Sequence, residues 1–123
     1  MTKQDATNAA TPKQMLELAK ICEPGKRWAV SFDDVVLVVA RLRYGLEVKS
    51  ASEKFDPLNN DAQLMQVVFA LWEKSAIKVE TIEHDSGKYF EAELVGFQWG
   101  ITNSAYGRTK QQAILNLAVE VLL

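Results

Sequence analysis

The sequence has very few of the residues that form disulfide bonds or bind metal ions. Cys22 is the only cysteine among the 123 residues, so no intramolecular disulfide can form, as is typical of the reducing cytoplasm. His84 is the only histidine, and a zinc site usually needs further His or Cys ligands. We therefore predict no metal centre, and we interpret Cys22 as a small buried thiol near a helix end.

Long hydrophobic runs are also missing. The longest, Val35 to Ala40, is far too short to cross a bilayer. Residues 1–14 contain no apolar stretch of the kind found in a signal peptide. These observations predict a soluble cytoplasmic protein with no membrane partner.

No excess of basic charge is present. Fourteen Lys and Arg stand against 16 Asp and Glu, which gives a net charge of −2. From residue 61 onward the acidic residues outnumber the basic ones. Because nucleic-acid-binding proteins usually carry a basic domain or stripe, a protein partner with a basic surface is favoured over nucleic acid.

Motifs for known reactions are absent as well. The chain has no Walker loop, no GxGxxG pattern and no GxSxG elbow. Asp33 and Asp34 stand where we predict a helix start, and carboxylates there favour the positive end of the helix dipole. We therefore interpret them as structural, and predict a protein that is not an enzyme and has no cofactor.

The chain length suits one domain with a short tail. Residues 1–11 are small and polar, and we predict a disordered tail there. Residues 12–123 are predicted to form a single α+β domain, with a helical N-terminal part at 12–54. Thr11 and Pro12 open its first helix as N-cap and first helical residue, and Pro24-Gly25 ends it.

The segment 28–44 has two interpretations. Trp28, Val30 and Phe32 alternate as in a short strand. Ser31 and Asp34 have the spacing of a capping box, and the apolar residues from Val35 onward recur at helical spacing. We predict a helix from 35 to Tyr44, although the β-branched valines favour a strand.

The second half reads as helix, three strands, helix. Asn60 and Gln63 predict a capped helix over 61–74, with a broad apolar face of Leu64, Met65, Val68, Phe69, Leu71 and Trp72. Alternation predicts strands at 77–84 and 88–95, joined by a turn at Asp85-Ser86-Gly87, and a third strand carrying Phe97, Trp99 and Ile101. Residues 102–107 are predicted as a loop.

The last helix is predicted from Thr109, with Gln112 in the capping-box position and a buried stripe of Ile114, Leu117, Ala118, Val121 and Leu122. The predicted fold is α+β: a three-stranded antiparallel sheet packed by helices, with an α-β-β-β-α core at 55–123. A fourth strand at 28–32 is an alternative that the residues leave open.

Two groups of residues are candidates for binding. Four glutamates project from neighbouring predicted strands and form a candidate protein-binding acidic face: Glu80, Glu83, Glu91 and Glu93. At the start of the last helix, Arg108, Thr109 and Lys110 are candidate phosphate contacts, because a helix N-terminus favours anions. We interpret the stretch first as a capped helix that covers the sheet and only second as a phosphate site, because the acidic sheet would repel a phosphate backbone.

Residues 55–123 resemble the phage ABA-sandwich domain family of small bacteriophage proteins. The resemblance is carried by FDPLNNDAQLMQVV at 55–68, the hairpin IKVETIEHDSGKYFEAEL at 77–94 and GRTKQQAILNLAVEVL at 107–122. It implies a phage or prophage origin, a host bacterial cytoplasmic location and a layered α/β fold. The family brings no catalytic residues to carry over.

Two further resemblances involve the C-terminal stretch. Double-stranded RNA-binding domains share the helix, three strands, helix order and hold phosphates at the start of their last helix. HicB-type antitoxins have a similar Gly-x-Thr helix start, matched here by Gly107 to Thr109. We expect a non-enzymatic phage accessory protein that binds a host or phage macromolecule, such as a host defence protein that it inhibits. The alternative is nucleic-acid binding through the last helix.

Overall fold

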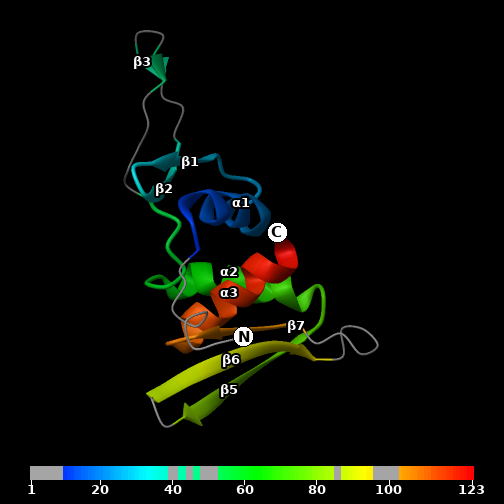
Figure 1. The fold of residues 1–123 in the computed structure, drawn as a ribbon. Helices are drawn as coiled ribbons and strands as arrows, with labels where there is room; N and C mark the ends of the chain where they lie inside the picture. Colours follow the sequence, from blue (N-terminus) through cyan, green and yellow to red (C-terminus); the bar gives the residue numbers. More distant parts are fainter. Residues whose placement is uncertain (1–9, 39–41, 44–45, 48–52, 85–86, 96–102) are drawn as a thin grey trace.

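The structure is a computed structural model that describes residues 10–38, 42–43, 46–47, 53–84, 87–95 and 103–123. The predicted tail at 1–11 lies almost wholly outside these residues. The described part contains three helices, a three-stranded antiparallel sheet and two-stranded antiparallel sheets, which confirms the α+β prediction. Figure 1 shows the three-stranded sheet at the bottom, the helices above it and a β-hairpin at the top.

The first helix, α1 (Pro12–Cys22), begins and ends where the sequence predicts. The Thr11 side chain accepts from the Gln14 N–H, and the Gln14 side chain accepts from the Thr11 N–H, a complete capping box. Leu18 and Ala19 are fully buried. The helix is therefore fixed at its start by local hydrogen bonds and along its length by packing.

The predicted helix at 35–44 is wrong. Strands β1 (Trp28–Ser31) and β2 (Asp34–Leu37) form a hairpin instead, with Ser31 opposite Asp34. The supposed capping box is thus a cross-strand pair, and the β-branched valines fit the pleated backbone. Strands β3 (Leu42–Arg43) and β4 (Leu46–Glu47) pair further along the chain.

The alternative of a fourth strand in the main sheet is also wrong, because β1 pairs only with β2 among the described residues. This hairpin is joined to the segment that follows it. The Phe55 N–H donates to the Val35 carbonyl at 2.8 Å, and the Leu37 N–H donates to the Glu53 carbonyl at 2.9 Å. The rings of Trp28 and Phe55 lie 5.8 Å apart between the two segments.

The second helix, α2 (Asp61–Trp72), has the predicted Asn60 cap, which accepts from the Gln63 N–H at 3.1 Å. Its buried face differs from the predicted one and consists of Gln63, Val67 and Leu71. Met65, Phe69 and Trp72 are 42%, 46% and 54% exposed on the opposite face. The apolar residues of α2 therefore surround the helix instead of lying on one side.

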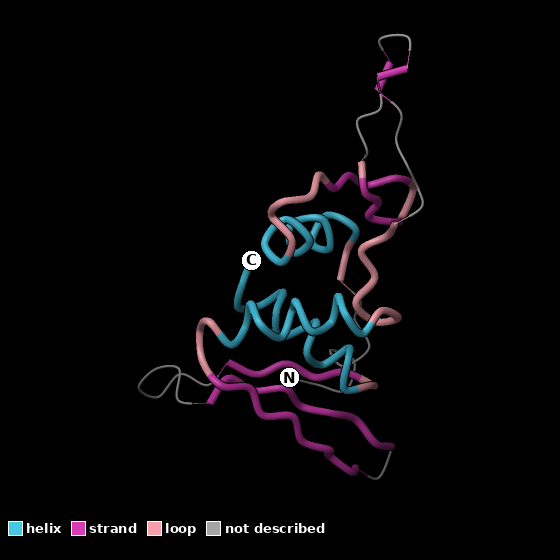
Figure 2. Tube along the Cα trace, turned by 180° about the vertical axis from the view of Figure 1, so that it is seen from behind, coloured by secondary structure: helices cyan, strands magenta, loops and turns pink. Residues whose placement is uncertain are grey.

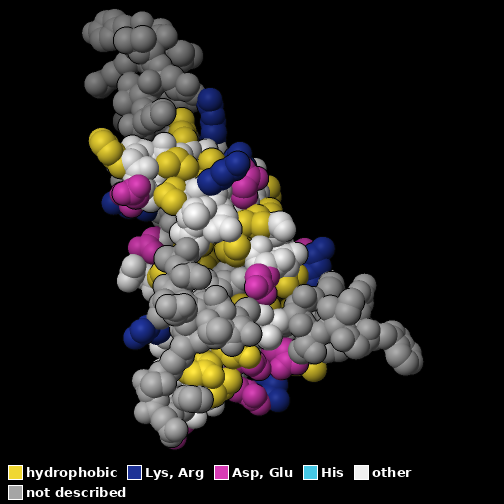
Figure 3. Space-filling view, viewed as in Figure 1, with side chains coloured by type: hydrophobic (Ala, Val, Ile, Leu, Met, Phe, Trp, Pro, Cys, Tyr) yellow, Lys and Arg dark blue, Asp and Glu magenta, His cyan; other side chains and the backbone are white. Residues whose placement is uncertain are grey.

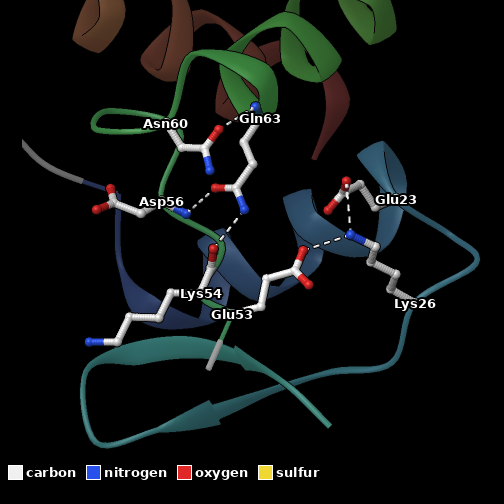
Figure 4. A network of polar contacts seen from close by, with 7 residues as sticks. All are labelled: Glu23, Lys26, Glu53, Lys54, Asp56, Asn60 and Gln63. Atoms are coloured by element: carbon white, nitrogen blue, oxygen red, sulfur yellow. Dashed lines mark hydrogen bonds and ion pairs between the residues drawn. The ribbon is translucent and has the colours of Figure 1, made fainter. Parts of the chain in front are cut away.

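Gln63 is buried because it holds the segment before α2. Its side-chain amide donates to the Lys54 carbonyl and accepts from the Asp56 N–H, both at 2.6 Å (Figure 4). In the same region, Lys26 lies 2.6 Å from Glu53 and 3.6 Å from Glu23. These contacts connect the part of the chain next to the β1–β2 hairpin, which we call the hairpin layer, to the helices.

The main sheet contains β5 (Ala76–His84), β6 (Gly87–Val95) and β7 (Asn103–Gly107), in that order. The predicted hairpin is confirmed, with His84 opposite Gly87, while Asp85 and Ser86 lie outside the described residues. The third strand is at 103–107, where a loop was predicted, and that loop prediction is wrong. The predicted strand residues Phe97, Trp99 and Ile101 lie outside the described residues.

The last helix, α3 (Lys110–Leu122), covers one face of the sheet (Figures 1 and 2). It contacts all three strands, and α2 contacts α3 and β5. Gly107 allows this close approach, because a Cβ there would lie 2.3 Å from the Ala113 nitrogen. Leu117, Ala118, Ala92 and Ala105 are buried between the layers. No helix covers the other face of the sheet within the described residues.

Candidate functional site

The face of the sheet that no described helix covers brings charged and aromatic side chains together. Ala92, Leu94 and Ala105 are buried on the helix side, so their neighbours along each strand point to the other side. We call that side the open face; it carries Lys78, Glu80, Ile82, Tyr89, Glu91, Glu93, Val95, Ser104 and Tyr106. Figure 3 shows acidic side chains gathered at the lower end of the molecule, over the sheet.

Strand register fixes the neighbours on the open face. Glu91 lies between Glu80 of β5 and Tyr106 of β7. One row away, Glu93 lies between Lys78 and Ser104. Three carboxylates therefore sit within two adjacent rows of a single sheet face.

The open face has its own polar contacts. Lys78 Nζ lies 2.7 Å from Glu80 Oε1, and this hydrogen bond raises the pKa of Lys78. Tyr106 donates its hydroxyl hydrogen to Glu91, and this bond, with burial, raises the pKa of Tyr106 to about 12. The rings of Tyr89 and Tyr106 lie 5.6 Å apart. The tyrosines thus provide an aromatic surface beside the carboxylates.

Three of the four predicted glutamates share this face, and the fourth does not. Glu80, Glu91 and Glu93 lie on it, whereas Glu83 pairs with Lys88 and has the parity of the helix side. Glu83 was grouped with the others by charge alone, without regard to strand parity. Tyr89 and Tyr106 were not predicted as site residues, although alternation along the strand places Tyr89 on the same side as Glu91 and Glu93.

At the candidate phosphate site, two of the backbone N–H groups at the start of α3 are already bonded within the helix cap. Thr109 Oγ1 accepts from the Gln112 N–H at 3.1 Å, which confirms the predicted cap. Gln112 Oε1 accepts from the Arg108 N–H at 3.1 Å. Lys110 Nζ lies 6.0 Å from the centre of the Phe90 ring. Arg108 and Lys110 are exposed, and no described contact joins their side chains to a common acceptor.

The described basic residues that would extend a phosphate site do not gather there. Lys26 is held by Glu23 and Glu53 near the hairpin layer, and Arg27 stands next to it in sequence. Figure 1 shows the turn between α1 and β1 in the upper part of the molecule and the start of α3 near the sheet. Arg41 and the side chain of Arg43 lie outside the described residues.

The other reactive side chains that the structure describes form no catalytic constellation. The pKa of Cys22 is raised to about 11 by burial and by Glu23, so the thiol stays protonated at neutral pH. Asp33 and Asp34 lie in the β1–β2 turn and at the start of β2, not at a helix start as predicted, and Asp34 is 3.1 Å from Lys54. The side chain of His84 lies outside the described residues.

The described residues contain no cluster of three or more His, Cys, Asp or Glu side chains that suits a metal ion. In that same part of the chain, every helix is too short or too polar to pass through a bilayer. No family model, curated protein sequence or solved structure matches the chain. The resemblance to the phage ABA-sandwich family therefore stays a prediction.

Proposed function

We propose that the protein binds a positively charged surface of another protein through the open face of its sheet. The observation that carries the proposal is the grouping of Glu80, Glu91 and Glu93 in two adjacent rows. Lys78 is the one cation among the described residues of this face, and it is already bonded to Glu80. The face therefore has net negative charge and complements lysine and arginine side chains.

The aromatic residues of the open face add a second kind of contact. Tyr89 and Tyr106 are partly buried, and their rings pack against each other at an interplanar angle of 58°. Tyrosine rings contact the aliphatic stems and charged heads of Lys and Arg favourably. A sheet also holds its side chains at fixed spacing, so binding here orders few additional groups.

A partner of this kind agrees with the role predicted from the sequence, that of a phage accessory protein acting on a host protein. A basic surface in a bacterial cell commonly belongs to a nucleic-acid-binding protein. By covering such a surface, the open face would compete with nucleic acid for the same charges. No catalytic step is needed for this action.

The test compares two variants of equal charge. The first replaces Glu80, Glu91 and Glu93 by Gln on the open face. The second replaces Glu17, Glu73 and Glu83 by Gln, which removes the same charge elsewhere. A fluorescently labelled lysine- and arginine-rich peptide is titrated with each protein at several salt concentrations.

We expect salt-sensitive binding by the unmodified protein and the second variant, and at least tenfold weaker binding by the first. Pull-downs from bacterial lysate with the same three proteins would then identify the natural partner. Equal binding by both variants would show that total charge, not the open face, drives the interaction. That result would remove the proposal.

A further inference from the structure

The outer edge of β5 is an unpaired strand edge. The strand order β5-β6-β7 places β5 on the outside of the sheet, and no strand pairs with its other edge within the described residues. In an antiparallel strand, every second residue directs its N–H and C=O away from the neighbouring strand. Figures 1 and 2 show β5 running along one side of the molecule.

This edge lacks several of the features that usually prevent strand addition. Natural edge strands are short, carry charged side chains, contain proline or bulges, point a charge inward or lie under another element. β5 does carry charges, with Lys78 and Glu80 on the open face and Glu83 on the helix side near its end. β5 has nine residues and no proline, and its register with β6 is continuous from end to end. Its central helix-side residues Ile77, Val79 and Thr81 are uncharged. The other edge strand, β7, has only five residues.

We propose that a second copy of this chain pairs with β5 in antiparallel orientation, with Val79 opposite Val79 of the second copy. The charges of β5 select this register. It places Lys78 opposite Glu80 of the second copy, and the twofold symmetry repeats this pair. Cross-strand pairs of opposite charge stabilise antiparallel sheets.

Neighbouring registers are disfavoured by the same charges. Shifting the axis by one residue to Glu80 sets Glu80 opposite its own copy, and shifting it to Lys78 sets two lysines opposite each other. Like charges directly opposite are destabilising. The register centred on Val79 also keeps uncharged residues together on the helix side, because Ile77 then faces Thr81 of the second copy.

The resulting dimer has a continuous six-stranded sheet. The helices of both copies lie on one side of it, and the two open faces join on the other. This assembly goes beyond the proposed function. Its register shares Lys78 and Glu80 with the open face, but its test measures association of the chain with itself and needs no partner protein. A dimer would nevertheless present two acidic faces to one partner, which increases binding through effective concentration.

The test is sedimentation velocity over a wide concentration range, with charge variants of β5. We expect a reversible monomer–dimer equilibrium for the unmodified protein. Lys78→Glu and Glu80→Lys should each weaken association at least about tenfold, since each converts two attractive cross-strand pairs into repulsive ones. The double swap Lys78→Glu with Glu80→Lys restores opposite charges and should restore dimerisation.

A matched control is Lys88→Glu, the same chemical change on the central strand, which should leave association unchanged. Circular dichroism melting at high dilution would show that each variant is folded. Crosslinking supplies a second readout in a Cys22→Ser background. A short bis-maleimide should join Lys78→Cys protein to Glu80→Cys protein more readily than either variant to itself.

Several results would overturn the proposal. The unmodified protein could remain a monomer at all concentrations, or the single substitutions could leave the dimer's association constant unchanged. A dimer abolished by Phe69→Ser but not by Lys78→Glu would assign association to the exposed face of α2 instead. Failure of the double swap to restore the dimer would exclude the register centred on Val79.

Discussion

Replacing Gln63 by Leu tests how the N-terminal part is attached to the helices. The Gln63 side chain is 5% exposed and serves both backbone groups of the preceding segment, the Lys54 carbonyl and the Asp56 N–H (Figure 4). Leucine has nearly the same volume, so it fills the site without making either hydrogen bond. The substitution therefore isolates the polar contribution from the packing contribution.

The magnitude follows from what the two backbone groups lose. A buried donor or acceptor left without a partner costs about 1–3 kcal/mol, and these two bonds are only partly buried, so the cost of each is about 1–2 kcal/mol. Two such groups give about 2–4 kcal/mol, and the more apolar leucine offsets part of this by about 1–2 kcal/mol. We expect the free energy of unfolding to fall by about 1–2 kcal/mol, a measurable share of the roughly 5–15 kcal/mol typical of domains.

The assay is urea unfolding followed by tryptophan fluorescence, with hydrogen exchange as a local probe. Gln66→Leu is the matched control, because Gln66 is on the same helix but exposed. That variant should stay within about 0.5 kcal/mol of the unmodified protein. Exchange at the Asp56 amide should accelerate only in Gln63→Leu. Equal stability of the two variants would refute the reasoning.

Four further changes have definite expected outcomes. Gly107→Ala should destabilise the domain by about 1–3 kcal/mol in thermal unfolding, because its Cβ would lie 2.3 Å from a backbone nitrogen of α3. Phe32→Gly should stabilise it by about 1 kcal/mol, whereas Phe32→Ala should not, since Phe32 has φ 56° and is 97% exposed. Tyr106→Phe should lower stability below about pH 10 and converge with the unmodified protein near pH 12, because the bond to Glu91 raises the folded-state pKa of Tyr106 to about 12 and its contribution is lost above that pH. In a salt titration we expect no binding of a duplex RNA of roughly 16 base pairs, and salt-dependent binding weakened by Lys110→Ala would instead support the nucleic-acid alternative.

Helix starts were predictable because their signals are local. Thr11, Asn60 and Thr109 each accept from the N–H three residues later, as the sequence spacing indicates. The β5–β6 hairpin was equally predictable, since strict alternation over two long strands has few other interpretations. These features depend on residues within one turn or one hairpin of each other.

The wrong predictions concern segments whose structure depends on contacts with residues far along the chain. Valine-rich β2 is a strand because it bonds both to β1 and to the segment at 53–55, and that second partner lies far along the chain. Strand β7 was missed because Ala105 and Gly107 are small, and small residues give weak strand signals. At Gly107 a larger residue has no room, because α3 lies directly against the strand.

The candidate site shows the same division between local and distant information. Charge counting located Glu80, Glu91 and Glu93, and alternation along β6 was sufficient to place Glu91 and Glu93 on one side. The inclusion of Tyr106 required the register between β6 and β7, because the sequence predicted a loop where that strand lies. The exclusion of Glu83 required only strand parity, because Glu80 and Glu83 are three residues apart on β5 and so lie on opposite faces. A negative face with an aromatic margin is therefore a property of the assembled sheet, and its chemistry comes from rows that cross three strands.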